Sequence, residues 1–229
     1  MKKFFSIYLF LFIFHLHTVK LNAQTQPQFM FATGGGTFTG IGDLKVLKDD
    51  RILSIAFTYD SMGIDKYSKE SDFLEKVAKK FIKDSVGYKK WIEEWNSNKH
   101  NFFEPEFIQA LNNELNNFGV NAILKTVDAK LTVLVSTTWI HIGWSSSLDV
   151  GTAGIIGSSI ANNESEVQLK LFIYEGDNQN KRIAEFSATG FFGSEKDFST
   201  TSGKRIASAY AKAGKEIGKF LCKRVYKKK

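Results

Sequence analysis

The order in which the hydrophobic patterns follow one another is the feature of this sequence that most restricts its fold. A short apolar run at residues 51–60 is followed by helical periodicity over 68–118, strand-like patterns over 120–192 and one long helical pattern over 201–226. Strands and helices do not alternate as a doubly wound fold requires. The order predicts an α+β domain: a mostly antiparallel sheet of four to five strands, helices packed mainly on one face, and a long C-terminal helix.

Three helices are expected between residues 68 and 118. The first two follow apolar residues that recur at helical spacing among lysines and glutamates. The third is expected to begin near Glu104, Pro105 and Glu106, because proline suits the first turn and acidic residues favour the positive end of the helix dipole. Gly119 stands where a glycine commonly ends a helix.

Strand patterns dominate the next part of the chain. Residues 120–127 form a short candidate strand and residues 130–144 a long one. In the long strand the apolar phase shifts, which indicates a bulge near residues 136–138 or burial of both faces. Alternating residues 165–175 and 181–192 flank a turn-rich segment and predict a β-hairpin.

The last helix carries two stripes of residues at helical spacing. The apolar stripe consists of Ile206, Tyr210, Ala213, Ile217 and Leu221. The second stripe contains only small residues: Ala207, Ala211, Gly214, Gly218 and Cys222. Small side chains let a helix backbone approach its neighbour closely, which offsets the low helix propensity of glycine. We expect this helix to lie tight against the sheet.

The first 23 residues have the three parts of a secretory signal peptide. Lys2 and Lys3 precede an apolar run from Phe4 to Leu16, and Ala23 stands before Gln24 at the expected cleavage site. The run is shorter than a membrane-spanning helix needs, so cleavage is favoured over a retained anchor. No later segment is apolar enough to span a membrane, and no cysteine at the cut site offers a lipid attachment point. We expect an exported protein, periplasmic or secreted.

The remaining chain is expected to form one domain without a disulfide. Its only cysteine is Cys222, so the fold depends on its core even in an oxidising compartment. Residues 24–50 are polar and glycine-rich and are expected to be flexible. Residues 51–226 are assigned to a single α+β domain, and residues 227–229 to a basic tail.

Much of the positive charge lies outside the expected domain. The chain has 31 basic and 24 acidic residues, and removal of Lys2, Lys3 and Lys20 leaves 28 against 24, a net charge of +4. Five of those basic residues fall in the last seven positions. A nucleic-acid partner is not expected, because such proteins spread basic residues over a binding surface. The sequence does not indicate an oligomeric state.

No catalytic, cofactor or metal site is expected. The tract from Gly34 to Gly42 fits no phosphate-binding register and precedes the first strand. His100 and His141 lie far apart in the sequence, and His141 is interpreted as a hydrogen-bonded structural residue. Cys222 lies on the small-residue stripe and is interpreted as a packed, inert thiol rather than a nucleophile activated by nearby lysines.

Three surfaces remain as candidate binding sites. Trp91 and Trp95 would stack on sugar rings if exposed, but aromatic residues at helical spacing usually belong to the core. If the protein were a hydrolase, its active site would have to be built from the serine- and glycine-rich loop of residues 145–163. The last helix carries a cationic face, which is interpreted either as a contact site for an anionic surface or as an ordinary solvated surface. Its residues are Arg205, Lys212, Lys215, Lys219 and Lys223.

Two stretches, residues 55–62 (IAFTYDSM) and 205–215 (RIASAYAKAGK), resemble uncharacterised secreted proteins of Bacteroidetes-type bacteria. The order of elements is also similar to the N-terminal domain of the Tol-system periplasmic protein and to curli-export lipoproteins. The resemblance implies an envelope role without catalysis and assigns no functional residues. It departs from the curli-export proteins, which are lipid-anchored.

The sequence thus favours a non-enzymatic exported envelope protein that binds another envelope component. Two alternatives stay open: a small hydrolase with a loop-built site, and a peripheral module that binds anions or lipid head groups.

Overall fold

The computed structural model describes residues 27–33, 35–126, 129–143, 164–176, 181–193 and 202–227. The expected signal peptide, with its cleavage site between Ala23 and Gln24, lies outside the described residues, as does the loop 145–163. Of the expected basic tail only Lys227 is described.

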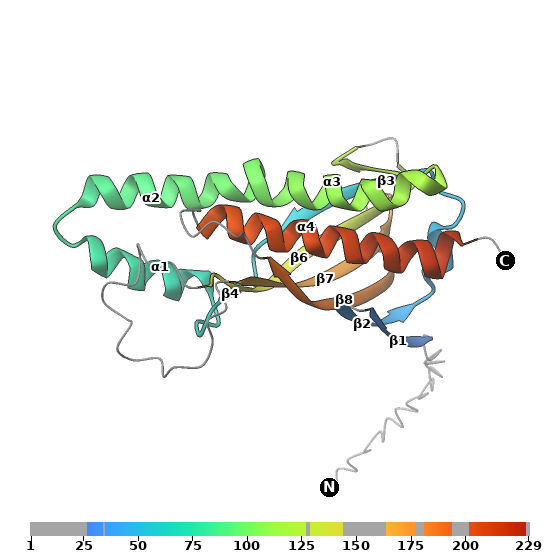
Figure 1. Cartoon of the computed structure of the whole chain (residues 1–229), viewed down its shortest axis with the longest axis horizontal. Coiled ribbons are helices and arrows are strands. Elements are labelled where there is room, and N and C mark those ends of the chain that lie inside the picture. The colour runs from blue at the N-terminus through green and yellow to red at the C-terminus, as the bar shows by residue number, and fades with distance from the viewer. Residues whose placement is uncertain are drawn as a thin grey trace, which may run out of the picture.

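A mixed sheet of eight strands forms one layer of the molecule (Figure 1). Along the sheet the strand order is β1-β2-β8-β7-β6-β3-β5, and the short β4 pairs with β6. The strands are β1 (Gln28–Thr33), β2 (Gly36–Gly42), β3 (Ile52–Thr58), β4 (Gly63–Ile64), β5 (Asn121–Leu124), β6 (Leu131–His141), β7 (Ser165–Glu175) and β8 (Arg182–Gly193).

The prediction of four to five mostly antiparallel strands is wrong. The sheet has eight strands, and β3 pairs in parallel with both β5 and β6, while β4 pairs in parallel with β6. Parallel neighbours need a long crossover connection, and the helices between β3 and β5 provide one. The helical segment between β3 and β5 therefore accounts for the parallel pairing in this part of the sheet.

The prediction that residues 24–50 are flexible is also wrong for the part that is described. Residues 28–42 form the hairpin of β1 and β2, and a 3-10 helix, η1 (Leu44–Leu47), follows. Phe38 is fully buried and its ring stacks on that of Phe220 at a centroid distance of 4.5 Å. A Cβ at Gly40 would lie 2.3 Å from the carbonyl oxygen of Glu185, so this glycine permits close packing between strands.

Within the described residues, four α-helices accompany the sheet: α1 (Glu70–Ala78), α2 (Ser85–Asn98), α3 (Glu104–Leu115) and α4 (Ser202–Leu221). A π-helical turn, η3 (Lys99–Phe103), joins α2 to α3, and Figure 1 shows the two helices lying end to end. The helix expected at Glu104 begins there, and Gly119 follows it in the left-handed conformation, with φ of 69°. These sequence predictions are confirmed.

Helices α3 and α4 lie side by side along the sheet (Figure 1). Helix α4 packs on β7 and β8 and supplies much of the core, while α3 packs on β5 and, through Phe107, on Phe57 of β3. The predicted long C-terminal helix is confirmed, and a π-helical turn, η5 (Cys222–Tyr226), extends it. Its small-residue stripe has a different neighbour from the one expected. A Cβ at Gly214 would lie 2.2 Å from the carbonyl oxygen of Phe107, so the glycine faces α3 rather than the sheet.

The long strands show two features expected from the sequence. A shift in the pairing of β6 with β7 lies between Thr137 and Trp139, which confirms the predicted bulge. Strands β7 and β8 pair antiparallel, which confirms the predicted hairpin.

Candidate functional site

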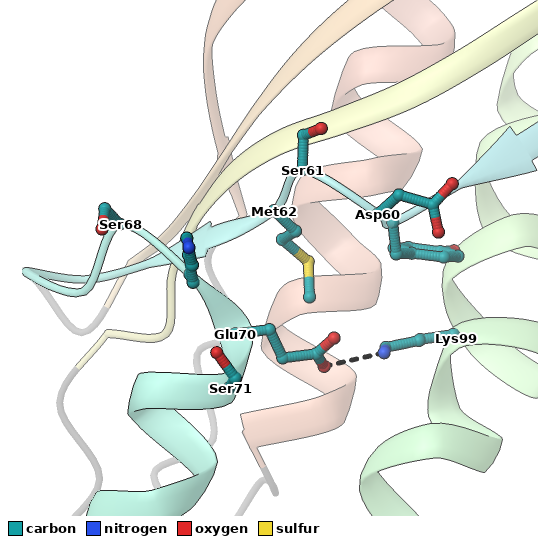
Figure 2. Close-up of a pocket in the computed structure, with 9 residues that line it drawn as sticks. Asp60, Ser61, Met62, Ser68, Glu70, Ser71 and Lys99 are labelled. Carbon is teal, nitrogen blue, oxygen red and sulfur yellow. Dashed lines mark hydrogen bonds and ion pairs between the residues drawn. The ribbon is translucent and has the colours of Figure 1, made fainter.

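A pocket of about 560 Å³ opens beyond the carboxyl end of β3 (Figure 2). Three segments that are distant in sequence line it: the loop after β3, the start of α1, and the turn after α2. The lining residues are Tyr59, Asp60, Ser61, Met62, Ser68, Lys69, Glu70, Ser71 and Lys99. In sheets with parallel strands the carboxyl ends are the usual place for a ligand, because the chain leaves the sheet there in loops.

The loop after β3 is shaped by local hydrogen bonds. The hydroxyl of Thr58 donates to the carboxylate of Asp60 at 2.7 Å, and the amide of Met62 donates to the carbonyl oxygen of Tyr59 at 3.1 Å. The tight turn that results places Met62 inward, where it is 1 % exposed. Figure 2 shows its side chain pointing toward Glu70.

An ion pair crosses the pocket. The ammonium of Lys99 lies 2.7 Å from Oε1 of Glu70, and the two side chains point toward one another in Figure 2. Lys99 is only 8 % exposed, and its Nζ also lies 5.2 Å from the ring centre of Tyr59. The indole N–H of Trp95 donates to the same carboxylate oxygen. Such contacts compensate the desolvation of two charges.

A second carboxylate, Glu104, lies behind the pocket and is 4 % exposed. Its Oε1 accepts a hydrogen bond from the hydroxyl of Tyr59 at 3.4 Å and lies 2.8 Å from Nδ1 of His100. Burial, with further contributions from Tyr210 and Glu104, raises the pKa of Tyr59 well above its usual value. Tyr59 therefore stays protonated and donates its hydrogen bond at any physiological pH.

Tyr210 of α4 links this network to the sheet. Its hydroxyl lies 2.5 Å from Oγ1 of Thr137 in β6, and burial raises its pKa as well. The rear wall of the pocket is thus held by hydrogen bonds between the helix layer and the sheet. The pocket presents an ion pair, an aromatic ring and the serine hydroxyls of its rim in a fixed arrangement, which suits recognition of a polar group.

Of the two candidate tryptophans on α2, one is buried and the other is half-buried. Trp95 is 3 % exposed, and its ring stacks on that of Trp91 at 5.9 Å. The interpretation of this pair as core is confirmed for Trp95, while Trp91 is half-buried. Through its bond to Glu70, Trp95 also supports the pocket.

The five basic residues of the candidate cationic face on the last helix differ in exposure and in their contacts. Arg205 is only 3 % exposed. Lys212 and Lys219 both lie near the buried carboxylate of Glu216, at 3.5 and 3.0 Å, and Lys223 lies over the ring of Phe31. Lys215 and Lys223 are exposed, while Lys212 and Lys219 are half-buried.

The buried carboxylate of Glu216 explains why Lys212 and Lys219 are not fully exposed. Burial alone would raise its pKa, but hydrogen bonds from Lys219 and Thr33 and the nearby ammonium groups lower it below the ordinary value. The carboxylate stays charged inside the protein and draws two of the candidate lysines toward it. Helical periodicity places residues on a face, but it does not show which face is buried.

Cys222 is 8 % exposed, and burial raises the pKa of its thiol to about 11. The interpretation as a packed thiol is confirmed, and the raised pKa favours the protonated form at neutral pH.

Among the described residues, no three His, Cys, Asp or Glu side chains gather closely enough to hold a metal ion. Within the same ranges, no helix combines the length and apolarity needed to cross a membrane.

His141 forms the hydrogen bond expected of a structural histidine. Its Nδ1 lies 2.6 Å from Oδ1 of Asp65, which also accepts the amide of Ile142. The hydrogen bond to Asp65 raises the pKa of His141, and partial burial opposes the shift. A raised pKa means that the folded protein binds the proton more tightly than the unfolded chain does.

We expect the stabilisation from His141 to be fully present below its unfolded pKa of about 6.5 and lost as pH rises through the folded value. The measurement is urea denaturation of the parent and His141→Gln at pH 5.5 and at pH 8.5. The difference in unfolding free energy between the two proteins should be larger at the lower pH. An equal difference at both values would contradict the assignment.

Sequence reasoning did not select Glu70, Lys99 or Tyr59 as site residues. One signal was present: Lys99 follows Trp91 and Trp95 at intervals of four, so a lysine continues an apolar helical stripe. A charged residue in that position needs a buried partner. Its partner Glu70 lies 29 residues earlier, on another helix, where no local pattern identifies it.

No family model matches this sequence, and a search of curated proteins gave no match. Among solved structures, the PelC dodecamer from Paraburkholderia phytofirmans is similar over 80 % of this chain and 97 % of that chain, with 10 % identity and a TM-score of 0.33. A substituted form of the same dodecamer gives the same coverage and identity, with a TM-score of 0.31. At these scores the similarity indicates neither a function nor an assembly.

Proposed function

We propose that this chain is an exported, non-enzymatic envelope protein that binds a polar segment of another envelope component in the pocket beyond β3. The observation that carries the proposal is the ion pair between Lys99 and Glu70 inside that pocket. The export part rests on the signal-like residues 1–23.

The ion pair supports binding because it is held in place before any ligand arrives. Trp95 and Tyr59 hold the two charges from one side, and Glu104 fixes Tyr59 from behind. A buried ion pair adds little net stability, since desolvation offsets the attraction between the charges. A preorganised donor and acceptor, by contrast, reduce the cost of ordering on binding.

The rim chemistry supports a polar ligand. Ser61, Ser68 and Ser71 offer hydroxyls that donate and accept hydrogen bonds, and Asp60 adds a carboxylate. Met62 provides the apolar part of the wall. A segment with amide or hydroxyl groups can pair with such a rim without leaving either partner unsatisfied.

The two alternatives have less support. The hydrolase would depend on residues 145–163, which lie outside the described residues. The anion-binding module would use the cationic face of α4, where Arg205 is buried and Glu216 neutralises neighbouring lysines.

Site-specific photocrosslinking in cells tests the proposal. A photoreactive residue placed at position 71, on the pocket rim, should crosslink this protein to one discrete partner in the envelope fraction. In the crosslinked product, this protein should begin at Gln24, as expected after signal cleavage. The same photoreactive residue at Ser97, an exposed position of α2 outside the lining, should give no such crosslink. Ser68→Trp, which obstructs the exposed rim, should abolish capture while the circular dichroism spectrum is unchanged.

Equal capture from Ser71 and Ser97 would contradict the pocket as binding site. A specific turnover by the purified protein lacking residues 1–23 would contradict its non-enzymatic role. Recovery of the chain in the cytoplasm with residues 1–23 attached would contradict export.

A further inference from the structure

The bend between α1 and α2 forms a projecting tip of the molecule. Helix α1, the 3-10 helix η2 (Lys79–Phe81) and helix α2 make a helical hairpin, and Figure 1 shows its bend at one end of the molecule, beyond the strands. The rings of Phe81 and Tyr88 contact each other across the bend at a centroid distance of 6.0 Å. The tip is thus a packed feature of the fold.

Two large apolar side chains at this tip face solvent. Ile82 is 80 % exposed and Val86 is 79 % exposed, more than any other large apolar residue in the described ranges. Single exposed apolar residues are ordinary on protein surfaces. Two β-branched residues four positions apart around one projecting bend are not, because none of the residues that the structure describes covers either of them.

Lysines flank the two apolar residues in the sequence. Residues 76–90 contain six lysines and one acidic residue, Asp84. All six are exposed: Lys76, Lys79, Lys80, Lys83, Lys89 and Lys90. The carboxylate of Asp84 accepts the amide of Gly87 at 2.8 Å, where it caps α2. Lys79 pairs with Glu75 at 2.7 Å, and with this carboxylate counted residues 75–90 carry a net charge of +4, as much as the whole chain after residue 23.

We propose that this tip docks on an anionic lipid surface, with Ile82 and Val86 inserted among the acyl chains and the lysines at the phosphate groups. Interfacial membrane contacts combine these two features: exposed aliphatic side chains and a surrounding ring of basic residues. Lysine side chains extend their ammonium groups to the head groups while their methylenes cover apolar surface. An acidic protein would pair with the lysines but would leave no reason for bare aliphatic side chains at the bend.

This docking surface is separate from the pocket and from the cationic face of α4. It requires neither a ligand beyond β3 nor the exposure of Arg205. The proposal therefore stands or fails independently of the proposed function, and its test uses vesicles rather than a protein partner.

Cosedimentation of the protein lacking residues 1–23 with vesicles tests the proposal. Vesicles of equal parts phosphatidylglycerol and phosphatidylcholine should bind it at least about tenfold more strongly than pure phosphatidylcholine vesicles. High salt should weaken the binding, because it screens the lysines. Equal binding to both kinds of vesicle would overturn the proposal.

Matched variants separate the two contributions. Ile82→Ser combined with Val86→Ser removes the aliphatic side chains without changing the charge and should reduce vesicle binding at least about tenfold. Met30→Ser is the control, because Met30 is 75 % exposed but lies on β1, at the other end of the molecule. It should bind as the parent does.

The charge contribution has its own pair of variants. Lys83→Glu with Lys89→Glu should weaken binding about tenfold or more. Lys45→Glu with Lys48→Glu makes the same change in net charge at η1, which packs against η5 at the other end of α4. If both pairs weaken binding equally, net charge rather than the tip is responsible and the proposal is wrong.

Insertion is measured with a polarity-sensitive dye on Val86→Cys. The buried Cys222 thiol, with its pKa of about 11, reacts too slowly to compete for the dye at neutral pH. Emission should shift to the blue on anionic vesicles, and the same dye on Met30→Cys should not shift. Salt-sensitive binding without a shift at residue 86 would indicate an acidic partner or simple adsorption, and would overturn insertion.

Discussion

Replacing Gly214 with alanine is expected to lower the free energy of unfolding by about 1–3 kcal/mol, the usual cost of overpacking a core. The expectation runs against helix propensity, since alanine is favoured over glycine in a helix by about 1 kcal/mol. The Cβ added at Gly214 would lie 2.2 Å from the carbonyl oxygen of Phe107 and 3.2 Å from the amide nitrogen of Leu111. Both are backbone atoms of α3, so α3 and α4 must move apart.

Lys215→Ala is the matched control, because Lys215 is the exposed neighbour of Gly214 in the same helix. It should leave the unfolding free energy within about 0.5 kcal/mol of the parent. Urea denaturation followed by circular dichroism measures both variants. If Gly214→Ala were as stable as the parent or more stable, the close approach of α3 and α4 would be refuted.

The sequence predicts elements well where periodicity is strong. Tyr210 and Ile217 recur on one stripe of α4, and both are buried as the pattern requires. The phase shift in the long strand predicts the bulge between Thr137 and Trp139 because each side chain of a strand must face either core or solvent. These features depend on near neighbours in the chain.

What the sequence does not predict depends on distant partners. Gly40 resembles a loop residue, yet it allows β2 to pack closely against Glu185 and Phe186 of β8. The small-residue stripe predicts a close approach without naming α3 as the neighbour of Gly214. The pocket is harder still, because its ion pair joins Glu70 and Lys99 from different helices.

Breaking the ion pair between Glu70 and Lys99 in the pocket is expected to cause a second large loss of stability. Glu70→Gln should lower the free energy of unfolding by about 2–3 kcal/mol, somewhat less than the cost of breaking a fully buried pair. It leaves the ammonium of Lys99, whose side chain is 10 % exposed, without its charged partner. Lys99→Met should cost less, because the carboxylate of Glu70 is 21 % exposed and keeps the hydrogen bond from Trp95. The double variant should be more stable than the sum of the two losses predicts.

The chain offers a matched control on the same helix. Glu75 and Lys79 also lie 2.7 Å apart, but their side chains are 69 % and 64 % exposed. Because water screens an exposed pair, Glu75→Gln should leave stability unchanged within error. Urea denaturation of all four variants at neutral pH shows whether burial of an ion pair or the distance between its charges determines the loss of stability. If Glu70→Gln and Glu75→Gln had equal effects, the pocket would be open to bulk water around Lys99, and the preorganised ion pair on which the proposed binding site depends would be refuted.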